Sequence, residues 1–142
     1  MDPEIIRFTF GETYFIKKAF EIRRLVFVIE QACPPELEYE HEEICQHYLA
    51  YMKGSAAGTA RWRKTPNGIK LERFAVRRDH RRQGVAFSLV KRLLDDVIPF
   101  NQKIYLHAQI DAMPLYSKAG FVAVGDQFEE AGIQHYKMIY NN

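Results

Sequence analysis

The residues best placed to do chemistry lie in a basic, glycine-containing segment, residues 77–88, with the sequence RRDHRRQGVAFS. The segment follows a strand-like run, residues 69–76, and leads into a periodic helix near Gly84. Phosphate groups bind at such turns, because unpaired N–H groups and the positive end of the helix dipole both face the anion. Gly84 lets the backbone approach a ligand closely, and Ala86 keeps the first helical turn from blocking it. Together with the guanidinium of Arg81, this spacing predicts a phosphate-binding turn.

Positive charge is concentrated on this turn and the helix that follows it. The formal net charge is +2, but residues 73–92 carry +6 and the rest of the chain carries −4. A basic nucleic-acid-binding module is one alternative interpretation, and its binding would fall steeply with salt. Because the balance elsewhere is acidic, we expect a local anion site and no nucleic-acid partner.

Acidic residues gather in a second segment, which contains Glu36, Glu38, Glu40, Glu42 and Glu43. One interpretation is a solvated loop. The other is an acidic rim that attracts a cationic substrate. The sequence leaves both open.

Length and composition indicate one domain spanning residues 1–142, long enough to bury a core of its own. Hydrophobic residues make up 47% and charged residues 27%, which is ordinary for a globular protein. No apolar run approaches the roughly 20 residues that span a bilayer, and the first residues lack the features of a signal peptide. We therefore expect a cytoplasmic protein with no membrane partner.

Cysteine and histidine residues give no metal or disulfide signature. Cys33 and Cys45 have neither CxxC spacing nor the density of a disulfide scaffold. His41, Cys45 and His47 are close in sequence, but no second pair of ligands follows at finger-like spacing. We expect no metal site.

The elements that would position the turn follow the order β-α-β-β-β-α-β-α-β, a mixed α/β sheet. The first helix should end before Pro34-Pro35, and an extended run resumes at Phe121. The apolar periodicity and turn signals predict strands over 5–10, 44–53, 56–64, 69–76, 103–108 and 132–140, and helices over 13–31, 84–99 and 111–119.

The fourth strand contains a break in its alternation. Ile69 and Leu71 share one phase of the two-residue period, whereas Phe74 and Val76 share the other. Such a change of phase predicts a β-bulge near residues 72–74, where strand pairing is interrupted.

Two sequence blocks resemble the GNAT acyltransferases. Arg81-Arg-Gln-Gly84-Val-Ala86 is similar to the family's R/Q-x-x-G-x-G/A signature and has the required strand before it and helix after it. Downstream, Gln109-x-x-Ala112-x-x-x-Tyr116-x-x-x-Gly120-Phe121 resembles the block N-x-x-A-x-x-x-Y-x-x-x-G-F. The resemblance covers nearly the whole chain in element order. It implies a mixed, mainly antiparallel α/β sheet with a central splayed strand pair, flanked by helices.

The resemblance implies acetyl-coenzyme A as the cofactor. Gln109 stands where the family most often has Asn, which puts a contact from this side chain to the pantetheine arm in doubt. With Arg81 beside it, the pyrophosphate would lie on the backbone N–H groups of Arg82, Gln83, Gly84, Val85, Ala86 and Phe87, with the hydroxyl of Ser88 as a further donor.

The bulged strand would supply further groups to the cofactor. In the family, backbone groups at the positions of Phe74, Ala75 and Val76 pair with the pantetheine arm, and an N–H polarises the thioester carbonyl. An N–H aimed at a developing oxyanion stabilises acyl-transfer charge. The side chains themselves are expected in the core.

Proton transfer requires an acid and a base. Tyr116 matches the family position whose phenol faces the coenzyme sulfur, and a phenol of pKa about 10 can protonate a thiolate. Glu72, just before the bulge, lies where several family members carry a catalytic carboxylate. His107 and Glu30 are further candidates for the base.

The resemblance thus implies transfer of an acetyl group from acetyl-CoA to a primary amine of a small molecule or peptide. The amine would attack directly in a ternary complex. A catalytically idle fold that binds coenzyme A and regulates another process is the alternative. The sequence leaves open the acceptor and the oligomeric state, with a homodimer as one option.

Overall fold

A seven-stranded sheet forms the centre of the fold in this computed structural model, which describes residues 2–33 and 40–141. Its strand order is β1-β2-β3-β4-β5-β7-β6, and every pair is antiparallel except β4 and β5. The mixed, mainly antiparallel sheet expected from the sequence is confirmed. The strands are β1 (Glu4–Phe8), β2 (Gln46–Met52), β3 (Ser55–Thr65), β4 (Gly68–Val76), β5 (Ile104–Gln109), β6 (Phe121–Glu130) and β7 (Ile133–Tyr140).

Two strand predictions need correction. The strand predicted over 44–53 starts only at Gln46, because Glu42–Ile44 form a 3₁₀ turn. The extended run after Phe121 is a full strand, β6, which the predicted element order omitted. β6 is an edge strand whose residues are mostly exposed, so it lacks the apolar alternation that identifies a half-buried strand.

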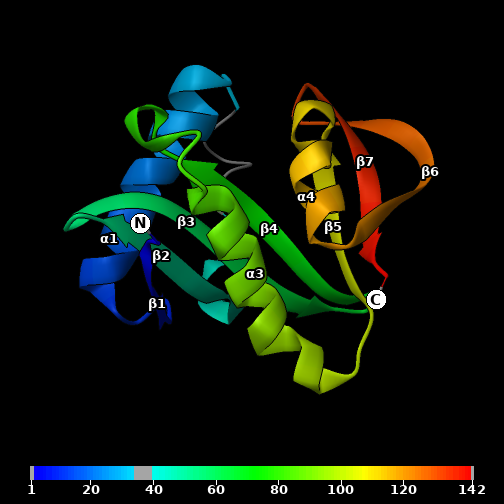
Figure 1. Ribbon diagram of the computed structural model, residues 1–142, viewed down its shortest axis with the longest axis horizontal. Coiled ribbons are helices and arrows are strands. Elements are labelled where there is room, and N and C mark those ends of the chain that lie inside the picture. The colour runs from blue at the N-terminus through cyan, green and yellow to red at the C-terminus, as the bar shows by residue number, and fades with distance from the viewer. Residues whose placement is uncertain (1, 34–39, 142) are drawn as a thin grey trace.

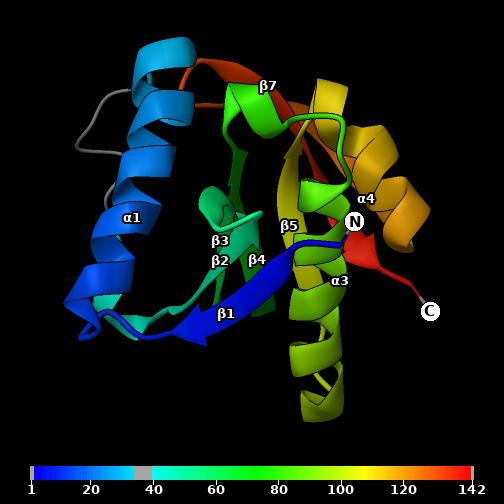
Figure 2. The same ribbon diagram turned by 60° about the vertical axis from the view of Figure 1, so that its left-hand side comes forward.

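Helices cover both faces of the sheet, with α1 on one face and α3 and α4 on the other (Figure 2). The helix predicted over 13–31 is continuous but changes type, because α1 (Thr13–Arg23) runs on as the π-helix η1 (Arg24–Glu30). Pro34 and Pro35, expected to end it, lie outside the described residues. The remaining helices are α3 (Val85–Val97) and α4 (Met113–Ala119), with short 3₁₀ turns η3 (Arg78–His80), η4 (Ile98–Phe100) and η5 (Ile110–Ala112). Every helix in the described ranges is too short or too polar to span a bilayer.

The core consists of two clusters, one on each face of the sheet. The larger one joins α3 to β2–β5, and the smaller one joins α1 to β1, β2 and β4. Leu89, Leu93 and Val97 of α3 are completely buried in the larger cluster. Each such side chain contributes about 1.5–3 kcal/mol relative to an exposed position, so α3 and the turn before it are firmly attached to the sheet.

β4 bulges where its alternation changes phase. The register with β3 shifts between Thr59–Ala75 and Arg61–Glu72, and Arg73 has a φ of 58°. Leu71 is therefore buried on the α3 face, whereas Ala75 is buried on the α1 face. The predicted bulge is confirmed.

β4 and β5 separate after a short parallel contact. Only Ile69 pairs with Ile104 and Lys70 with Tyr105. Beyond these pairs the two strands diverge, as Figure 1 shows. The splayed central pair implied by the resemblance is thus present, and it opens beside the bulge.

Candidate active site

A cavity of about 890 Å³ lies where β4 and β5 diverge. Its wall includes residues of both strands, of η1 and of the first turn of α3, together with α4 and β7. Arg81, Gly84, Gln109 and Tyr116, all predicted site residues, line this one space with the bulge of β4. The fold therefore brings together two sequence blocks that lie far apart along the chain.

The turn at the start of α3 presents free backbone donors. Gly84 occupies the N-cap with a φ of 80°, in the left-handed region that favours glycine, and no side chain caps the helix. The first intrahelical bond in this turn is donated by the N–H of Ser88 to the carbonyl of Gly84, at 3.0 Å. The N–H groups of residues 85–87 therefore face outward at the positive end of the helix dipole. This geometry can bind an anion.

Arg81 is engaged in an ion pair with the end of η1. Its Nη1 and Nη2 donate to the carboxylate of Glu30 at 3.0 and 2.8 Å, and its Nε donates to the carbonyl of Val76 at 2.9 Å. The pairing lowers the pKa of Glu30, chiefly through the Arg81 hydrogen bond. Arg81 thus holds the turn against both η1 and the end of β4.

The other predicted turn residues divide into two groups. Arg82, Val85, Ala86 and Phe87 line the cavity, although the side chain of Val85 is buried in the core. Gln83 and Ser88 do not line it. Arg82 has a φ of 62° and an exposed side chain.

The β4 residues predicted to contact the cofactor also line the cavity. The side chains of Phe74 and Val76 pack against the cluster under α3, and that of Ala75 is buried on the opposite face. The carbonyl of Val76 accepts the hydrogen bond from Arg81. Phe74 and Val76 are only half-buried, so their side chains as well as the backbone of this segment form part of the cavity wall.

Tyr116 projects from α4 and packs against two aromatic side chains. Its ring meets Phe74 edge-on with 5.6 Å between the ring centroids, and lies 6.2 Å from Phe121. Burial raises the pKa of the Tyr116 phenol above its ordinary value. The hydroxyl makes no hydrogen bond to any residue in the described part of the chain. A protonated, unengaged phenol on the cavity wall can donate a proton.

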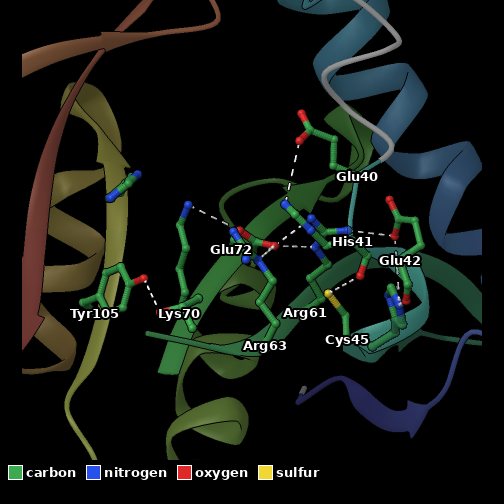
Figure 3. Close-up of polar contacts among 12 residues, drawn as sticks. Glu40, His41, Glu42, Cys45, Arg61, Arg63, Lys70, Glu72 and Tyr105 are labelled. Carbon is green, nitrogen blue, oxygen red and sulfur yellow. Dashed lines mark hydrogen bonds and ion pairs between the residues drawn. The ribbon is translucent and has the colours of Figure 1, made fainter. Parts of the chain in front are cut away.

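Glu72 is surrounded by cations, as Figure 3 shows. Its Oε2 accepts from Nε of Arg61 at 2.7 Å and Nε of Arg63 at 3.0 Å, and its Oε1 lies 3.5 Å from Nζ of Lys70. Although burial alone would raise the pKa of Glu72, the three cations lower it to about 2. A carboxylate of such low basicity is a poor proton acceptor, which argues against the predicted role of Glu72 as general base.

Glu42, expected on a solvated loop or an acidic rim, is instead buried. Arg23 donates to both of its oxygens, at 3.0 and 2.6 Å, and Nη1 of Arg61 lies 2.8 Å from its Oε1. The expectation of an acidic rim is therefore wrong for Glu42. Glu40 and Glu43 are exposed, whereas Glu36 and Glu38 lie outside the described residues.

A histidine–carboxylate cluster lies on the β5–β7 side of the cavity. Nδ1 of His107 lies 3.1 Å from Oε1 of Glu130, and Nε2 of His135 lies 3.8 Å from Oε2. The His107 hydrogen bond is the main cause of the lowered pKa of Glu130. Since a carboxylate only accepts, Nδ1 of neutral His107 carries the proton and Nε2 keeps a lone pair. This side chain, on the cavity wall, can therefore accept a proton.

Gln109 bonds to η1 across the mouth of the splay. Its Nε2 donates to Oε1 of Gln31 at 3.0 Å, and Nε2 of Gln31 is 3.4 Å from Oε1 of Gln109. The two carboxamides thus connect the end of β5 to the residue that follows η1. Gln31 was not predicted as a site residue.

The sequence analysis also missed the polar residues on the α1 face of the sheet. Their signal was the period-two spacing of charged residues on neighbouring strands, which places them on one face. The missed residues are Arg61, Arg63, Lys70, Glu130 and His135.

The residues considered for a metal site have other partners. Sγ of Cys45 donates to the carbonyl of His41 at 3.0 Å, and burial raises the pKa of Cys45 to about 11. Nε2 of His47 lies 2.9 Å from the carbonyl oxygen of Glu42. Across residues 2–33 and 40–141, no group of three His, Cys, Asp or Glu side chains could hold a metal ion.

Solved structures of other proteins share this fold. The crystal structure of Escherichia coli ElaA has a TM-score of 0.87 with 24% identity, covering 97% of this chain and 99% of that one. A GNAT family acetyltransferase from Elizabethkingia anophelis, solved with acetyl-CoA bound, has a TM-score of 0.71 with 18% identity, over 97% and 95% of the two chains.

Comparison of the amino-acid sequence with known proteins identifies the family. The uncharacterized N-acetyltransferase YjcF of Bacillus subtilis is 35% identical over 127 residues, which cover 87% of this chain and 91% of the relative. The family model of the acetyltransferase (GNAT) domain matches residues 21–141. A family model that spans most of the chain, a relative of this similarity and the splayed sheet together lead to one conclusion: the chain belongs to the GNAT acetyltransferase family.

Proposed function

We propose that the protein transfers an acetyl group from acetyl-CoA to a primary amine. The observation that carries the proposal is the uncapped start of α3, with Gly84 at its N-cap, opening into the cavity between β4 and β5. Membership of the GNAT acetyltransferase family supports acyl transfer as the reaction class.

The residues present suit a coenzyme A ester. The N–H groups of residues 85–87 would hold the pyrophosphate, and Arg81 would hold the turn in place. The backbone around Ala75 would accept the pantetheine arm, because β4 pairs with β5 only at Ile69 and Lys70 and its edge faces the splay beyond them. Acetyl-CoA bound there would supply an acetyl group activated as a thioester.

The reaction exchanges one bond for another and moves two protons. A nitrogen–carbon bond forms as the carbon–sulfur bond breaks, the amine loses a proton, and the coenzyme leaves as a thiol. We assign the proton donor to Tyr116, whose phenol is protonated at neutral pH and lies on the cavity wall. We assign the proton acceptor to His107, oriented by Glu130, in place of Glu72.

The test has two parts, binding and turnover. Isothermal titration calorimetry should detect acetyl-CoA binding, and a thiol-release assay should detect turnover with at least one amine of a panel of amino acids, amino sugars, polyamines and peptides. Tight acetyl-CoA binding with no turnover across the panel would favour an idle, regulatory fold. Absence of acetyl-CoA binding would refute the proposal.

A further inference from the structure

The cavity has a second polar region, on the α1 face of the sheet, whose cationic side acetyl transfer itself does not explain. It is formed by two sets of side chains on opposite sides of the splay. Arg63 and Lys70 lie on the β3–β4 side, and His107 and Glu130 lie on the β5–β7 side; all four line the cavity. One side is thus cationic, whereas the other contains a carboxylate and an imidazole.

The two cations have donors to spare. Nε of Arg63 donates a hydrogen bond to Glu72. No residue of the described ranges accepts a hydrogen bond from the other two guanidinium nitrogens of Arg63. Lys70 makes one ion pair with Glu72, at 3.5 Å. A guanidinium carries five N–H donors and an ammonium three. Their side chains are only 17% and 13% exposed, and cations so removed from solvent are stabilised by anionic partners.

Ion pairs along this face leave positive charge in excess. Four cations, Arg23, Arg61, Arg63 and Lys70, meet two carboxylates, Glu42 and Glu72. Glu130 is a third carboxylate on the same cavity, and the charge of Lys70 lowers its pKa without a direct ion pair among the described contacts. Because Glu130 repels negative charge, a carboxylate is favoured here over a phosphate, which carries nearly two negative charges at neutral pH.

The opposite side suits an amine. Glu130 attracts an ammonium group, which loses one proton to solvent, and Nε2 of His107 then takes the second proton as the amine attacks the thioester. A molecule that spans both sides needs an amine at one end and a carboxylate at the other. We infer that the acceptor is an amino carboxylate, whose carboxylate binds Arg63 and Lys70 and whose amine binds at the His107–Glu130 pair. The inference rests on the proposed acetyl transfer and names its substrate class.

Pairs of acceptors that differ only in the carboxylate provide the test. β-Alanine and γ-aminobutyrate are each compared with the corresponding carboxamide in the thiol-release assay, and aminoethyl phosphate is compared with β-alanine. Charged hydrogen bonds contribute about 1.5–3 kcal/mol each, so the wild-type protein should prefer each acid over its amide by about tenfold or more in kcat/KM. Equal use of the amides, or a preference for aminoethyl phosphate, would overturn the inference without affecting acetyl transfer.

Variants connect the preference to the two cations. Arg63→Gln and Lys70→Gln should reduce the preference for the acid to below about threefold, because each removes about one charged hydrogen bond. Glu72 keeps Arg61 as a partner in both variants, and thermal unfolding verifies that they are folded. Lys64→Gln is the matched control, since Lys64 is an exposed lysine outside the cavity, and it should keep the full preference. An unchanged preference in both cavity variants would refute the assignment.

Binding measurements separate this inference from the proposed function. If acetyl-CoA binds but no amine is acetylated, calorimetry of acid and amide on protein saturated with coenzyme A decides between the outcomes. Binding of the acid alone, lost in Arg63→Gln, supports the inference; equal binding of both, or of neither, refutes it. If acetyl-CoA itself does not bind, the proposed function fails, and the same titrations on the free protein decide the substrate class.

Discussion

Arg81 and Glu30 form a two-point ion pair, at 3.0 and 2.8 Å, that joins the proposed phosphate-binding turn to the end of η1. The sequence pattern predicts that the guanidinium of Arg81 binds a phosphate group. In the structure its fork geometry is matched to a carboxylate from a segment 51 residues earlier in the chain. Its main contribution is therefore to hold the turn in the shape that presents the N–H groups of α3.

Removal of Arg81 should weaken acetyl-CoA binding more than removal of its carboxylate partner does. Arg81→Ala loses both the ion pair and the bond to the Val76 carbonyl, and about 1.5 kcal/mol for a charged hydrogen bond corresponds to an affinity loss of about tenfold. Glu30→Gln keeps the bond to Val76 and should cost less than about threefold. Calorimetry measures both values.

The matched control for Arg81 is Arg78, in the same basic turn. Arg78 is 80% exposed, and its Nη2 lies 3.6 Å from Oε2 of Glu30. Arg78→Ala therefore removes one positive charge from the turn but keeps the ion pair between Arg81 and Glu30. It should leave acetyl-CoA affinity within about twofold of wild type, since exposed pairs contribute little. An equal loss in both arginine variants would mean that only net charge matters.

Tyr116→Phe should lower kcat and leave acetyl-CoA affinity unchanged. The substitution removes a hydroxyl that bonds to no described residue, so packing against Phe74 is kept. Loss of a general acid reduces turnover by roughly 10²-fold. Steady-state kinetics and calorimetry test the two halves. Tyr105→Phe, which loses a hydroxyl bonded to Thr65 outside the cavity, is the control and should keep wild-type kcat. Unaltered turnover in Tyr116→Phe would remove Tyr116 from the mechanism.

Glu72→Gln should destabilise the protein and reduce its sensitivity to acid. The pKa of Glu72 is lowered to about 2, so its stabilising effect is full above its ordinary pKa and is lost as the pH falls from about 5 towards 2. Breaking a buried charge network costs about 3 kcal/mol at neutral pH. Urea unfolding at a series of pH values measures the free energy.

The control for this substitution is Glu43→Gln, because Glu43 is an exposed carboxylate next to the buried Glu42. It should change the unfolding free energy by less than about 0.5 kcal/mol. Equal stability losses in Glu72→Gln and Glu43→Gln would show that the three cations around Glu72 do not stabilise the fold.

The sequence predicted the fold well because its strongest signals were local. The phase change between Leu71 and Phe74 revealed the bulge, and the position of Gly84 marked the start of α3. The same locality explains the errors. Glu42 belongs to an acidic run in sequence but is paired with Arg23 and Arg61 in space. Partners on other elements cannot be read from spacing along one segment.

Gly58→Ala should destabilise the protein and disturb the turn. A Cβ on Gly58 would lie 2.9 Å from Cγ1 of Val85 and 3.2 Å from the carbonyl oxygen of Ala75, so α3 must shift away from β3. Overpacking of this kind costs about 1–3 kcal/mol, and the start of α3 is the proposed phosphate site. Thermal unfolding and acetyl-CoA titration should both show the loss. Gly11→Ala, which meets no atom within 4 Å, should leave both unchanged.

Gln31 and Gln109 should be energetically coupled, since their carboxamides bond to each other between η1 and β5. A double-mutant cycle with Gln31→Ala and Gln109→Ala should give a coupling of about 0.5–1.5 kcal/mol in the free energy of unfolding. Gln127 and Gln134 form a comparable pair at 3.0 Å on exposed positions, and the control cycle there should give less than about 0.5 kcal/mol.

Acetyl-CoA should abolish the coupling between Gln31 and Gln109. The resemblance to the family's N-x-x-A block predicts that Gln109 faces the pantetheine arm, and a carboxamide that turns to a ligand leaves its former partner. In the presence of saturating acetyl-CoA, the cycle should therefore give a coupling near zero, while the Gln127–Gln134 control keeps its value. A coupling that persists with acetyl-CoA would mean that Gln109 stays bonded to η1. In that case the exchange of Asn for Gln has converted a ligand contact into a fixed connection across the splay.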